Sequence, residues 1–353
     1  MKVIVVGAGI IGATIAYNLS RDGADVTVVT DQSPSATQAS FGWINASFYA
    51  DEVHHRLRVT SMAAYGRLMD TLPSLPIQMN GALWWEEQGD GLTALQDALL
   101  TLGYPVERLD SVDVSALEPE LRGLPDVFLR FPSEGDAEPD ALAAALLKAS
   151  GAHVVTGVRV KRIIENNGMV CGVETQMGIM AANKVIVAAG NGAPEILASV
   201  DVALPMLVRP GALVATKPIS GKVSSVLVTP NGEARQLPDG RILASAVASH
   251  QSDSSDKVIE NAVEIAVRVL AWLDPLIGDE RLEWDCVSLA YRPVPEDGLP
   301  VIGRVGLDGL YVAVMHSGVT LAAITGEAIA ADVLGKGDAF DALLAPYRPS
   351  RFQ

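Results

Sequence analysis

The sequence predicts an α/β (α+β) fold in which a Rossmann-like domain, built on a parallel sheet, carries a second, strand-rich domain. Residues 1–30 read as strand, helix and strand, and this alternation returns after residues 136 and 283. Such alternation is typical of a parallel sheet, whereas the short strands in between are typical of a mixed or antiparallel one. We therefore expect one discontinuous domain of residues 1–75, 137–204 and 284–353, and a second domain built from two insertions, residues 76–136 and 205–283.

The N-terminal unit places a glycine-rich turn between a strand and a helix. The apolar residues 3–6 are followed by Gly7, Gly9 and Gly12 at the spacing G-x-G-x-x-G, and a second apolar run covers residues 26–29. The three glycines allow a tight turn, close approach of a phosphate and close helix packing. The free amides at the helix N-terminus favour a pyrophosphate, so the unit predicts a dinucleotide site. The expected contacts in the turn are Gly7, Gly9, Ile10, Ile11 and Gly12.

The end of the second strand departs from the usual fingerprint. An Asp or Glu there commonly binds the adenosine ribose, but this chain has Thr30 followed by Asp31. Either Asp31 turns toward the ribose or the Thr30 hydroxyl makes a weaker contact. The fingerprint alone is compatible with FAD and with NAD.

Composition limits the classes of protein. The 353 residues are 49% hydrophobic and carry a net charge of −16, which argues against nucleic acid and anionic membranes as partners. We expect the two cysteines, Cys171 and Cys286, to be small buried residues. The sequence has no signal-peptide pattern and no apolar run long enough to span a membrane, so we expect a cytoplasmic protein.

The remaining elements follow from periodicity and turn residues. Residues 31–49 form a long polar loop before a helix at 51–72, and Asn80-Gly81 predicts a turn between paired strands within 77–86. The other expected helices cover residues 91–102, 112–117, 139–149, 255–272 and 318–334. The other expected strands cover residues 106–109, 127–131, 153–155, 159–164, 170–175, 178–181, 184–189, 211–216, 226–229, 234–237, 241–246, 284–292 and 310–314.

Six segments in this order resemble a known family. They are residues 3–12, 39–42 (ASFG), 136–139 (DAEP), 186–190 (IVAAG), 288–303 (SLAYRPVPEDGLPVIG) and 310–326. Together they resemble the D-amino acid oxidase and glycine oxidase (DAO) family of flavoproteins, which includes sarcosine oxidase and related dehydrogenases. The resemblance implies FAD as the cofactor. We expect non-covalent FAD, because the loop at 31–49 has no histidine and Cys286 lies in no tethering motif.

Arg292 and His316 are the candidate catalytic residues. Arg292 ends an apolar strand, where a charge is costly unless it meets an anion, and its guanidinium suits a substrate carboxylate. The resemblance implies the same role, and the alternative is an ion pair with Glu296 or Asp297. His316 either hydrogen-bonds the flavin or substrate or is an ordinary loop residue.

The loop that begins at Ser40 is expected to cover the isoalloxazine, with Trp43 over the ring and the Asn45 amide at its pyrimidine edge; the alternative is a surface loop. The helix that starts at Gly318 would direct its N-terminal amides to reduced flavin, which carries negative charge. The expected cofactor contacts in these regions are Ser40, Phe41, Gly42, Trp43, Val160, Ala189, Gly190, Gly318, Val319 and Thr320, with Ser317 beside them.

Other polar residues receive ordinary interpretations. We expect His54 and His55 to be exposed on their helix, and Arg159 and Lys161 to be solvated. Either Arg209 or Arg235 is a candidate to face the cleft. The adjacent Trp84 and Trp85 must point to opposite sides of their strand.

These observations predict an FAD-dependent oxidoreductase that oxidises the C–N bond of a small carboxylated amine by hydride transfer to flavin N5. One alternative passes electrons to a quinone or a partner subunit rather than to oxygen. A second is a flavin-holding subunit of a larger amine, opine or hydroxyproline dehydrogenase, and a third is an NAD-dependent dehydrogenase. The expected partners are the amino acid or amine substrate and either a second copy of the chain or a partner subunit.

Overall fold

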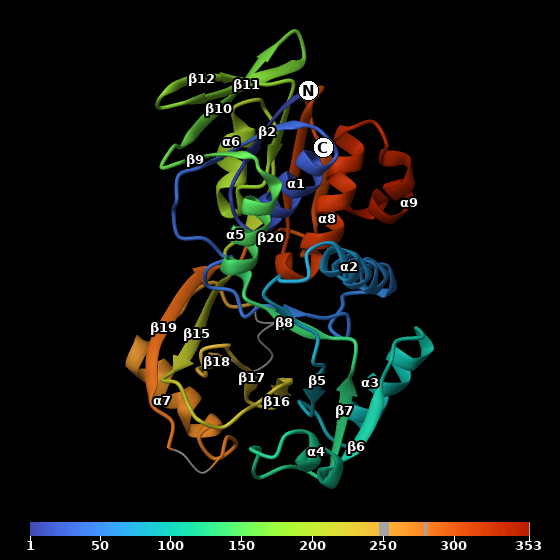
Figure 1. Cartoon of the computed structure of the whole chain (residues 1–353), viewed down its shortest axis with the longest axis vertical. Coiled ribbons are helices and arrows are strands. Elements are labelled where there is room, and N and C mark those ends of the chain that lie inside the picture. The colour runs from blue at the N-terminus through green and yellow to red at the C-terminus, as the bar shows by residue number, and fades with distance from the viewer. Residues whose placement is uncertain (247–253, 279–280, 353) are drawn as a thin grey trace.

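The computed structural model describes residues 1–246, 254–278 and 281–352. Figure 1 shows two parts, an upper one with both termini and a lower one rich in strands. The N-terminal unit forms as predicted, with β1 (Lys2–Val6), α1 (Ile10–Arg21) and β2 (Asp25–Thr30). Around it lies a six-stranded sheet in the order β21-β22-β13-β1-β2-β9, parallel except at β21. The added strands are β9 (His153–Thr156), β13 (Lys184–Val187), β21 (Val301–Arg304) and β22 (Leu310–Val314).

Both faces of this sheet are covered, because side chains alternate along each buried strand. On β1, Val3 and Val5 join the core beneath the helices, whereas Ile4 and Val6 join the core on the opposite face. The helices on the first face are α1, α2 (Glu52–Thr71), α5 (Pro139–Ser150) and α8 (Gly318–Val333). The second face carries α6 (Ala193–Ala198) and a three-stranded sheet of β10 (Val160–Asn166), β11 (Met169–Thr175) and β12 (Gly178–Ala181).

Helices α1 and α8 pack so closely that a glycine is required at their contact. A Cβ on Gly326 would lie 2.4 Å from Thr14 Cγ2 and 2.9 Å from the Thr14 carbonyl oxygen. We expect Gly326→Ala to lower the free energy of unfolding by about 1–3 kcal/mol through overpacking. The matched control is Gly66→Ala on α2, where a Cβ would meet nothing within 4 Å.

Since alanine favours helix over glycine, Gly66→Ala should stabilise the protein by about 0.5–1 kcal/mol. Urea unfolding of both variants measures the two effects. Equal changes in both would show that helix propensity, and not the α1–α8 contact, controls the result at Gly326.

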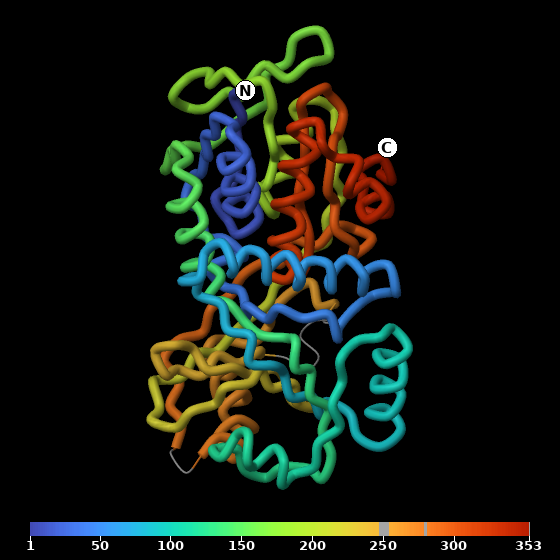
Figure 2. The backbone as a smooth tube through the Cα atoms, turned by 45° about the vertical axis from the view of Figure 1, so that its right-hand side comes forward, coloured from blue at the N-terminus to red at the C-terminus, as the bar shows by residue number. Residues whose placement is uncertain are grey.

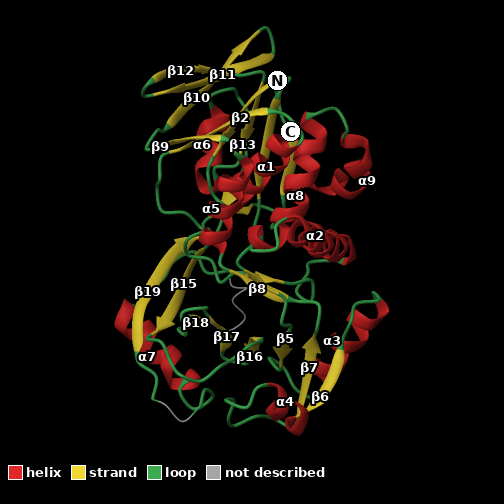
Figure 3. Ribbon diagram, in the orientation of Figure 1, coloured by secondary structure: helices red, strands yellow, loops and turns green. Residues whose placement is uncertain are grey.

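The lower part is built on one mixed, eight-stranded sheet to which both insertions contribute. Its order is β19-β15-β18-β17-β16-β5-β7-β6, and β16 pairs with β5 in parallel, which joins the two insertions directly. The strands are β5 (Ala82–Trp84), β6 (Glu107–Asp110), β7 (Val127–Phe131), β15 (Pro210–Thr216), β16 (Val226–Thr229), β17 (Gly232–Gln236), β18 (Ile242–Ser245) and β19 (Trp284–Tyr291). The helices α3 (Asp90–Thr101), α4 (Ser111–Leu117) and α7 (Ala262–Leu273) accompany it (Figure 3). As predicted, Trp84 and Trp85 enter the cores on opposite sides of the sheet.

Smaller elements complete the chain. A three-stranded sheet, β3-β8-β4, lies between the two parts (Figure 1), and β14 pairs with β20. These strands are β3 (Trp43–Ile44), β4 (Ile77–Gln78), β8 (Gly135–Ala137), β14 (Met206–Leu207) and β20 (Val294–Pro295). The C-terminal region contains α9 (Asp341–Leu344), and 3₁₀ turns cover Gly190–Gly192, Gly337–Phe340, Ala345–Tyr347 and Pro349–Phe352. Within the described ranges, no helix is long and apolar enough to cross a bilayer.

One expectation about strand pairing is wrong. The strands within residues 77–86 do not form a hairpin, because β4 pairs with β8 while β5 pairs with β7 and β16. β19, whose residues fall within the range 284–353 expected in the Rossmann-like domain, pairs with β15 along its length, from Pro210↔Tyr291 to Thr216↔Trp284. The pairing therefore places residues 284–291 with the second sheet, and the division into domains otherwise stays a prediction.

The helix expected at 255–272 also differs. It begins at Ala262, because Asn261 forms a capping box with Glu264. Val263 and Val267 are 55% and 60% exposed, and the buried residues are Ile265, Ala266, Val269 and Leu273. Cys286 is exposed and Cys171 is partly exposed, so the prediction that both cysteines are buried is wrong. Each lies on a strand with one face toward solvent.

Candidate active site

One cavity of about 1290 Å³ opens where the carboxyl ends of β1, β2, β13 and β22 face strands β15 and β19 of the second sheet. Ligands of parallel α/β sheets bind at this edge, and the volume exceeds the usual 300–1,000 Å³ of a small-molecule pocket. The lining includes nearly all of the predicted site residues: Gly7, Gly9, Ile10, Ile11, Thr30, Asp31, Ser40, Phe41, Gly42, Trp43, Val160, Ala189, Gly190, Arg292, His316, Gly318, Val319 and Thr320.

Gly12 is the predicted contact that does not line this cavity. A Cβ at Gly12 would lie 2.0 Å from the Gly7 carbonyl oxygen, so this glycine serves the close packing of helix on turn. Gly7 has φ +110°, and a Cβ there would lie 2.3 Å from the Ala188 oxygen. Close backbone contacts therefore require glycine at both Gly7 and Gly12.

The N-terminus of α1 forms an anion cradle. Its N-cap is Gly9, which supplies no side-chain acceptor, and the intrahelical bonds begin with the Ala13 amide donating to Gly9 O (2.9 Å). The Ile10 amide donates to Thr37 Oγ1 (3.0 Å), a contact that no local sequence pattern predicts. In the described ranges the Ile11 amide has no acceptor, and Ile11 lines the cavity. A free amide at this helix end fits a pyrophosphate group.

Thr30 and Asp31 both reach the cavity, but each accepts a hydrogen bond within its own loop. Thr30 Oγ1 accepts from the Gln32 amide (3.3 Å), and Asp31 Oδ1 accepts from the Ser33 amide (3.0 Å). Either residue keeps further hydrogen-bonding capacity for a ribose hydroxyl. Arg159 forms an exposed pair with Glu195, in agreement with a solvated residue.

The loop after Ser40 is buried from Phe41 to Ser47, so the alternative of a surface loop is wrong. Glu134, which is 0% exposed, anchors it. Its carboxylate accepts from Trp43 Nε1 (3.0 Å), the Ala46 and Ser47 amides (3.0 and 2.8 Å) and the Tyr104 hydroxyl (2.8 Å). Burial raises the pKa of Glu134, while these donors favour its ionised form.

Helix α2 holds the first turn of α8 against the loop. The Tyr65 hydroxyl donates to Val319 O (2.5 Å) and Ser61 Oγ donates to Thr320 O (2.6 Å). Thr320 Oγ1 in turn donates to Trp43 O (3.0 Å). Figure 2 shows α2, in light blue, crossing the junction between the two parts. The N-terminal end of α8, at the cavity wall, is thus fixed relative to the loop.

Arg292 and His316 lie in the same cavity. Arg292 Nη2 donates to Pro210 O (3.1 Å) and Arg292 Nε donates to Arg209 O (3.4 Å), so the backbone at the start of β15 orients the guanidinium. Asp297, one of the structural partners considered for Arg292, is instead paired with Arg351 at 2.6 Å. His316 Nδ1 lies 3.4 Å from Ser317 Oγ.

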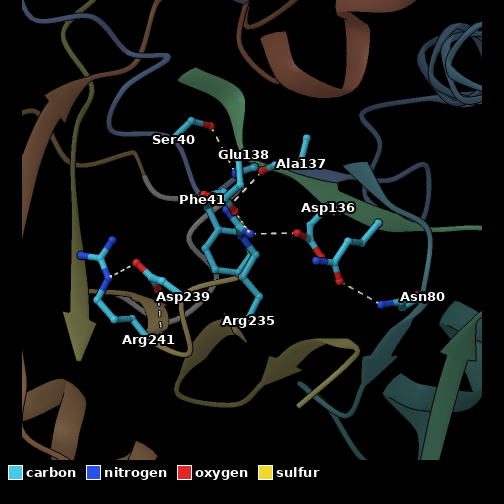
Figure 4. A network of polar contacts seen from close by, with 11 residues as sticks. Ser40, Phe41, Asn80, Asp136, Ala137, Glu138, Arg235, Asp239 and Arg241 are labelled. Atoms are coloured by element: carbon cyan, nitrogen blue, oxygen red, sulfur yellow. Dashed lines mark hydrogen bonds and ion pairs between the residues drawn. The ribbon is translucent and has the colours of Figure 1, made fainter. Parts of the chain in front are cut away.

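Arg209 and Arg235 are the two candidates to face the cleft, and neither lines the cavity. Arg235 is 1% exposed. Figure 4 shows Arg235 reaching from β17 to β8 and to the loop. Its guanidinium donates to Asp136 Oδ1 (2.8 Å), Glu138 Oε1 (2.6 Å) and Phe41 O (2.5 Å). Burial raises the pKa of Asp136 to about 6, and the attraction of Arg235 opposes that rise.

Comparison with known proteins agrees with this geometry. Residues 2–332 match the DAO family, described as FAD dependent oxidoreductase. The chain belongs to this family. The resemblance inferred from the six segments is therefore confirmed. Members of this family are FAD-dependent amino acid oxidases and dehydrogenases, so the alternative of an NAD-dependent dehydrogenase is wrong.

Relatives of the DAO chain cover nearly its whole length. The uncharacterized oxidoreductase YurR of Bacillus subtilis is 28% identical, with 98% of each chain covered. A D-amino acid dehydrogenase of Cereibacter sphaeroides is 27% identical over 92% of this chain and 89% of its own. The crystal structure of glycine oxidase from Geobacillus kaustophilus superposes with a TM-score of 0.86 at 24% identity, covering 99% and 98%, which supports the fold.

The DAO chain departs from expectation at His54 and His55, which are 8% and 5% exposed rather than solvated. They face inward because α2 lies between the two parts. His54 Nδ1 accepts from the Ala50 amide (3.1 Å). His55 packs edge-on against Tyr49 and Tyr104. Burial, assisted by the charge of Arg58, lowers the pKa of His54 to about 4, although Asp51 acts in the opposite direction.

This lowered pKa predicts acid sensitivity. Between pH 6.5 and about 4 the unfolded chain binds a proton at His54 that the folded chain does not, so stability falls as pH falls. We expect this one histidine to reduce the free energy of unfolding by about 2 kcal/mol between pH 7 and pH 5. In urea unfolding, His54→Gln should lose less stability than the parent over that interval. His153→Gln, at an exposed histidine on β9, should behave like the parent.

Proposed function

We propose that this DAO protein oxidises the C–N bond of a small carboxylated amine: glycine, a D-amino acid, an N-alkyl amino acid or a cyclic imino acid. The observation that carries the proposal is that Arg292 opens into the same cavity as the amide cradle of α1 and the N-terminus of α8. An anion-binding cation beside a dinucleotide site suits an amino acid carboxylate. The relatives named D-amino acid dehydrogenase and glycine oxidase act on such compounds by name.

FAD would be held by the α1 cradle, the residues around Thr30 and Asp31, the loop at Ser40–Trp43 and the start of α8. When bound, it supplies N5 as the hydride acceptor. We propose that it is bound non-covalently. In support, the 31–49 loop contains no histidine, and neither Cys171 nor Cys286 is among the residues that line the cavity.

The chain's own residues position the substrate and exclude water. Arg292, oriented by the backbone of β15, binds the carboxylate and so places the amine and its α-hydrogen within the cavity. The loop at 41–47, which is buried, shields its side of the cavity from solvent. The α8 N-terminus places partial positive charge where electron density increases during the reaction. No strong base is required, because the amine can release its proton on binding.

The electron acceptor separates two versions of this function. An oxidase returns electrons to oxygen, whereas the flavin subunit of an amine, opine or hydroxyproline dehydrogenase passes them to a quinone or partner. The relatives named D-amino acid dehydrogenase support the second version, and those named glycine oxidase the first.

The test is the visible spectrum of the purified protein, recorded anaerobically before and after addition of carboxylated amines. A flavin spectrum bleached by one compound supports the proposal and identifies the substrate. Recovery on admission of air identifies an oxidase, and lack of recovery until a quinone is added identifies a dehydrogenase. A colourless protein that gains no spectrum with FAD, or a flavin bleached only by amines that lack a carboxylate, would overturn it.

A further inference from the structure

Asn45, whose amide we expect at the pyrimidine edge of the flavin, forms a buried pair beside the cavity with Arg58, which has no role described above. Asn45 is 1% exposed and lines the cavity, whereas Arg58, on α2, is 0% exposed and does not. Arg58 Nε donates to the Asn45 carbonyl oxygen (3.0 Å) and Arg58 Nη2 donates to Asn45 Oδ1 (2.6 Å). Burying a guanidinium is costly, and among the described residues Arg58 donates hydrogen bonds to Asn45 alone, so the pair requires an explanation.

The chemistry of the pair fixes how the Asn45 amide is turned. A guanidinium has only donors, so the side-chain atom that meets Arg58 must be the oxygen. The amide nitrogen therefore points away from Arg58, and it makes no hydrogen bond to any described residue. The Asn45 backbone amide donates to Thr320 Oγ1 (3.3 Å) in the first turn of α8. Asn45 is thus held from α2 and from α8, and it lines the cavity with an amide N–H that is not used by Arg58.

We propose that Arg58 is a positioning residue that holds the Asn45 amide as a hydrogen-bond donor to the bound flavin and thereby favours the reduced flavin. The inference rests on the proposed function only in requiring that FAD occupies this cavity. A cation bound to an amide oxygen polarises the amide and strengthens its N–H donor. Reduced flavin carries negative charge, so such a donor binds it more strongly than oxidised flavin and raises the midpoint potential.

Arg58 keeps its charge in this environment. Burial lowers the pKa of its guanidinium to about 10, and the negative charge of Glu134 opposes that fall. The group is therefore cationic at neutral pH. Arg58→Lys would keep the charge but lose the two-point contact with Asn45.

The experiment measures the midpoint potential of FAD in the holoenzyme, by anaerobic titration against a reference dye, together with the dissociation constant of oxidised FAD. The variants are Asn45→Ala, Asn45→Asp, Arg58→Met, Arg58→Lys and the double variant Asn45→Ala/Arg58→Met. The matched control is Arg67→Met, because Arg67 also links α2 to α8, through a surface pair with Glu327 at 2.6 Å, but lies outside the cavity.

We expect Asn45→Ala and Arg58→Met each to reduce the preference for reduced over oxidised flavin about tenfold, which is about 30 mV for a two-electron couple. Asn45→Asp should also lower the midpoint potential, since it presents an oxygen in place of the N–H. The midpoint potential of Arg58→Lys should lie between those of Arg58→Met and the parent. The double variant should match Asn45→Ala alone, because Arg58 acts through Asn45. Arg67→Met should match the parent.

Additive losses in the double variant, or an unchanged potential in Asn45→Ala and Asn45→Asp, would overturn the inference. Should Arg58→Met not fold, the two Asn45 variants decide, since they leave Arg58 in place. A parent protein that binds no FAD would contradict the proposed function instead, and a parent that binds FAD with a potential insensitive to Asn45 contradicts only this inference.

Discussion

Arg292→Met is expected to lower kcat/KM for the amine substrate by about 10²- to 10³-fold, because loss of a charge-assisted contact in a partly closed site costs about 3–4 kcal/mol. Arg292 lines the cavity, and the carbonyl groups of Arg209 and Pro210 hold its guanidinium. The effect should fall mainly on KM, since the carboxylate is bound in the ground state as well as in the transition state. Steady-state kinetics with the substrate found in the spectral assay measures it.

Arg292→Lys should retain part of this affinity, because a lysine keeps the charge but not the two parallel donors. Arg209→Lys is the matched control. Arg209 directly precedes β15, its side chain donates to Val208 O (3.0 Å), and it does not line the cavity. Should Arg292→Met leave KM for carboxylated amines unchanged, or should the Arg209 variant match it, the carboxylate does not bind at Arg292.

Arg235→Met is expected to lower the free energy of unfolding by about 3–5 kcal/mol, because it leaves a buried carboxylate without its cation. Asp136 is 6% exposed and loses its partner, and the Phe41 carbonyl loses its donor. Loss of that donor should also weaken FAD binding, since the loop from Phe41 lines the cavity. Urea unfolding and FAD titration measure the two effects.

The pH dependence and a control sharpen this prediction. Without Arg235, the pKa of Asp136 should rise further. The loss of unfolding free energy in Arg235→Met should therefore be larger at pH 8, where ionising Asp136 is most costly, than at pH 5, where Asp136 is protonated. Adding Asp136→Asn should restore part of the stability. Arg241→Met removes the half-exposed pair with Asp239 in Figure 4 and should cost at most about 1 kcal/mol. Equal losses in the two arginine variants would contradict a special role for Arg235.

Short sequence patterns predict most of the dinucleotide-binding half of the site. Gly7 and Gly12 can be predicted because a Cβ on either would clash with backbone that is close in sequence or at the end of the adjacent parallel strand, whereas a Cβ on Gly9 would meet Thr37 in the loop at 31–49. For the same reason, the sequence predicts that α8 begins at Gly318 and that Arg292 lies at the end of a strand. Such features depend on backbone geometry, which short patterns encode.

The polar support behind the site could not be predicted, because its partners are distant in sequence. Glu134 meets the Trp43–Ser47 loop across about ninety residues, and Arg235 meets Phe41 across 194. An isolated Glu or Arg in a polar stretch gives no sign of burial. The burial of His54 and His55 could not be predicted for the same reason. Helical spacing shows which residues share a face, but not that α2 is covered on both sides.

The parallel pairing of β5 with β16 also bears on how the chain is synthesised. The register Leu83↔Leu227 spans about 140 residues, and β1 must wait still longer for β13, through Val3↔Lys184. A nascent chain therefore emerges with the edges of its first strands unpaired, and neither sheet can close until its late partners leave the ribosome. Closing such long loops slows folding and leaves strand edges open to aggregation. Protein released before β22 would lack an inner strand of its nucleotide-binding sheet, so we expect truncated chains to require chaperones or to be degraded.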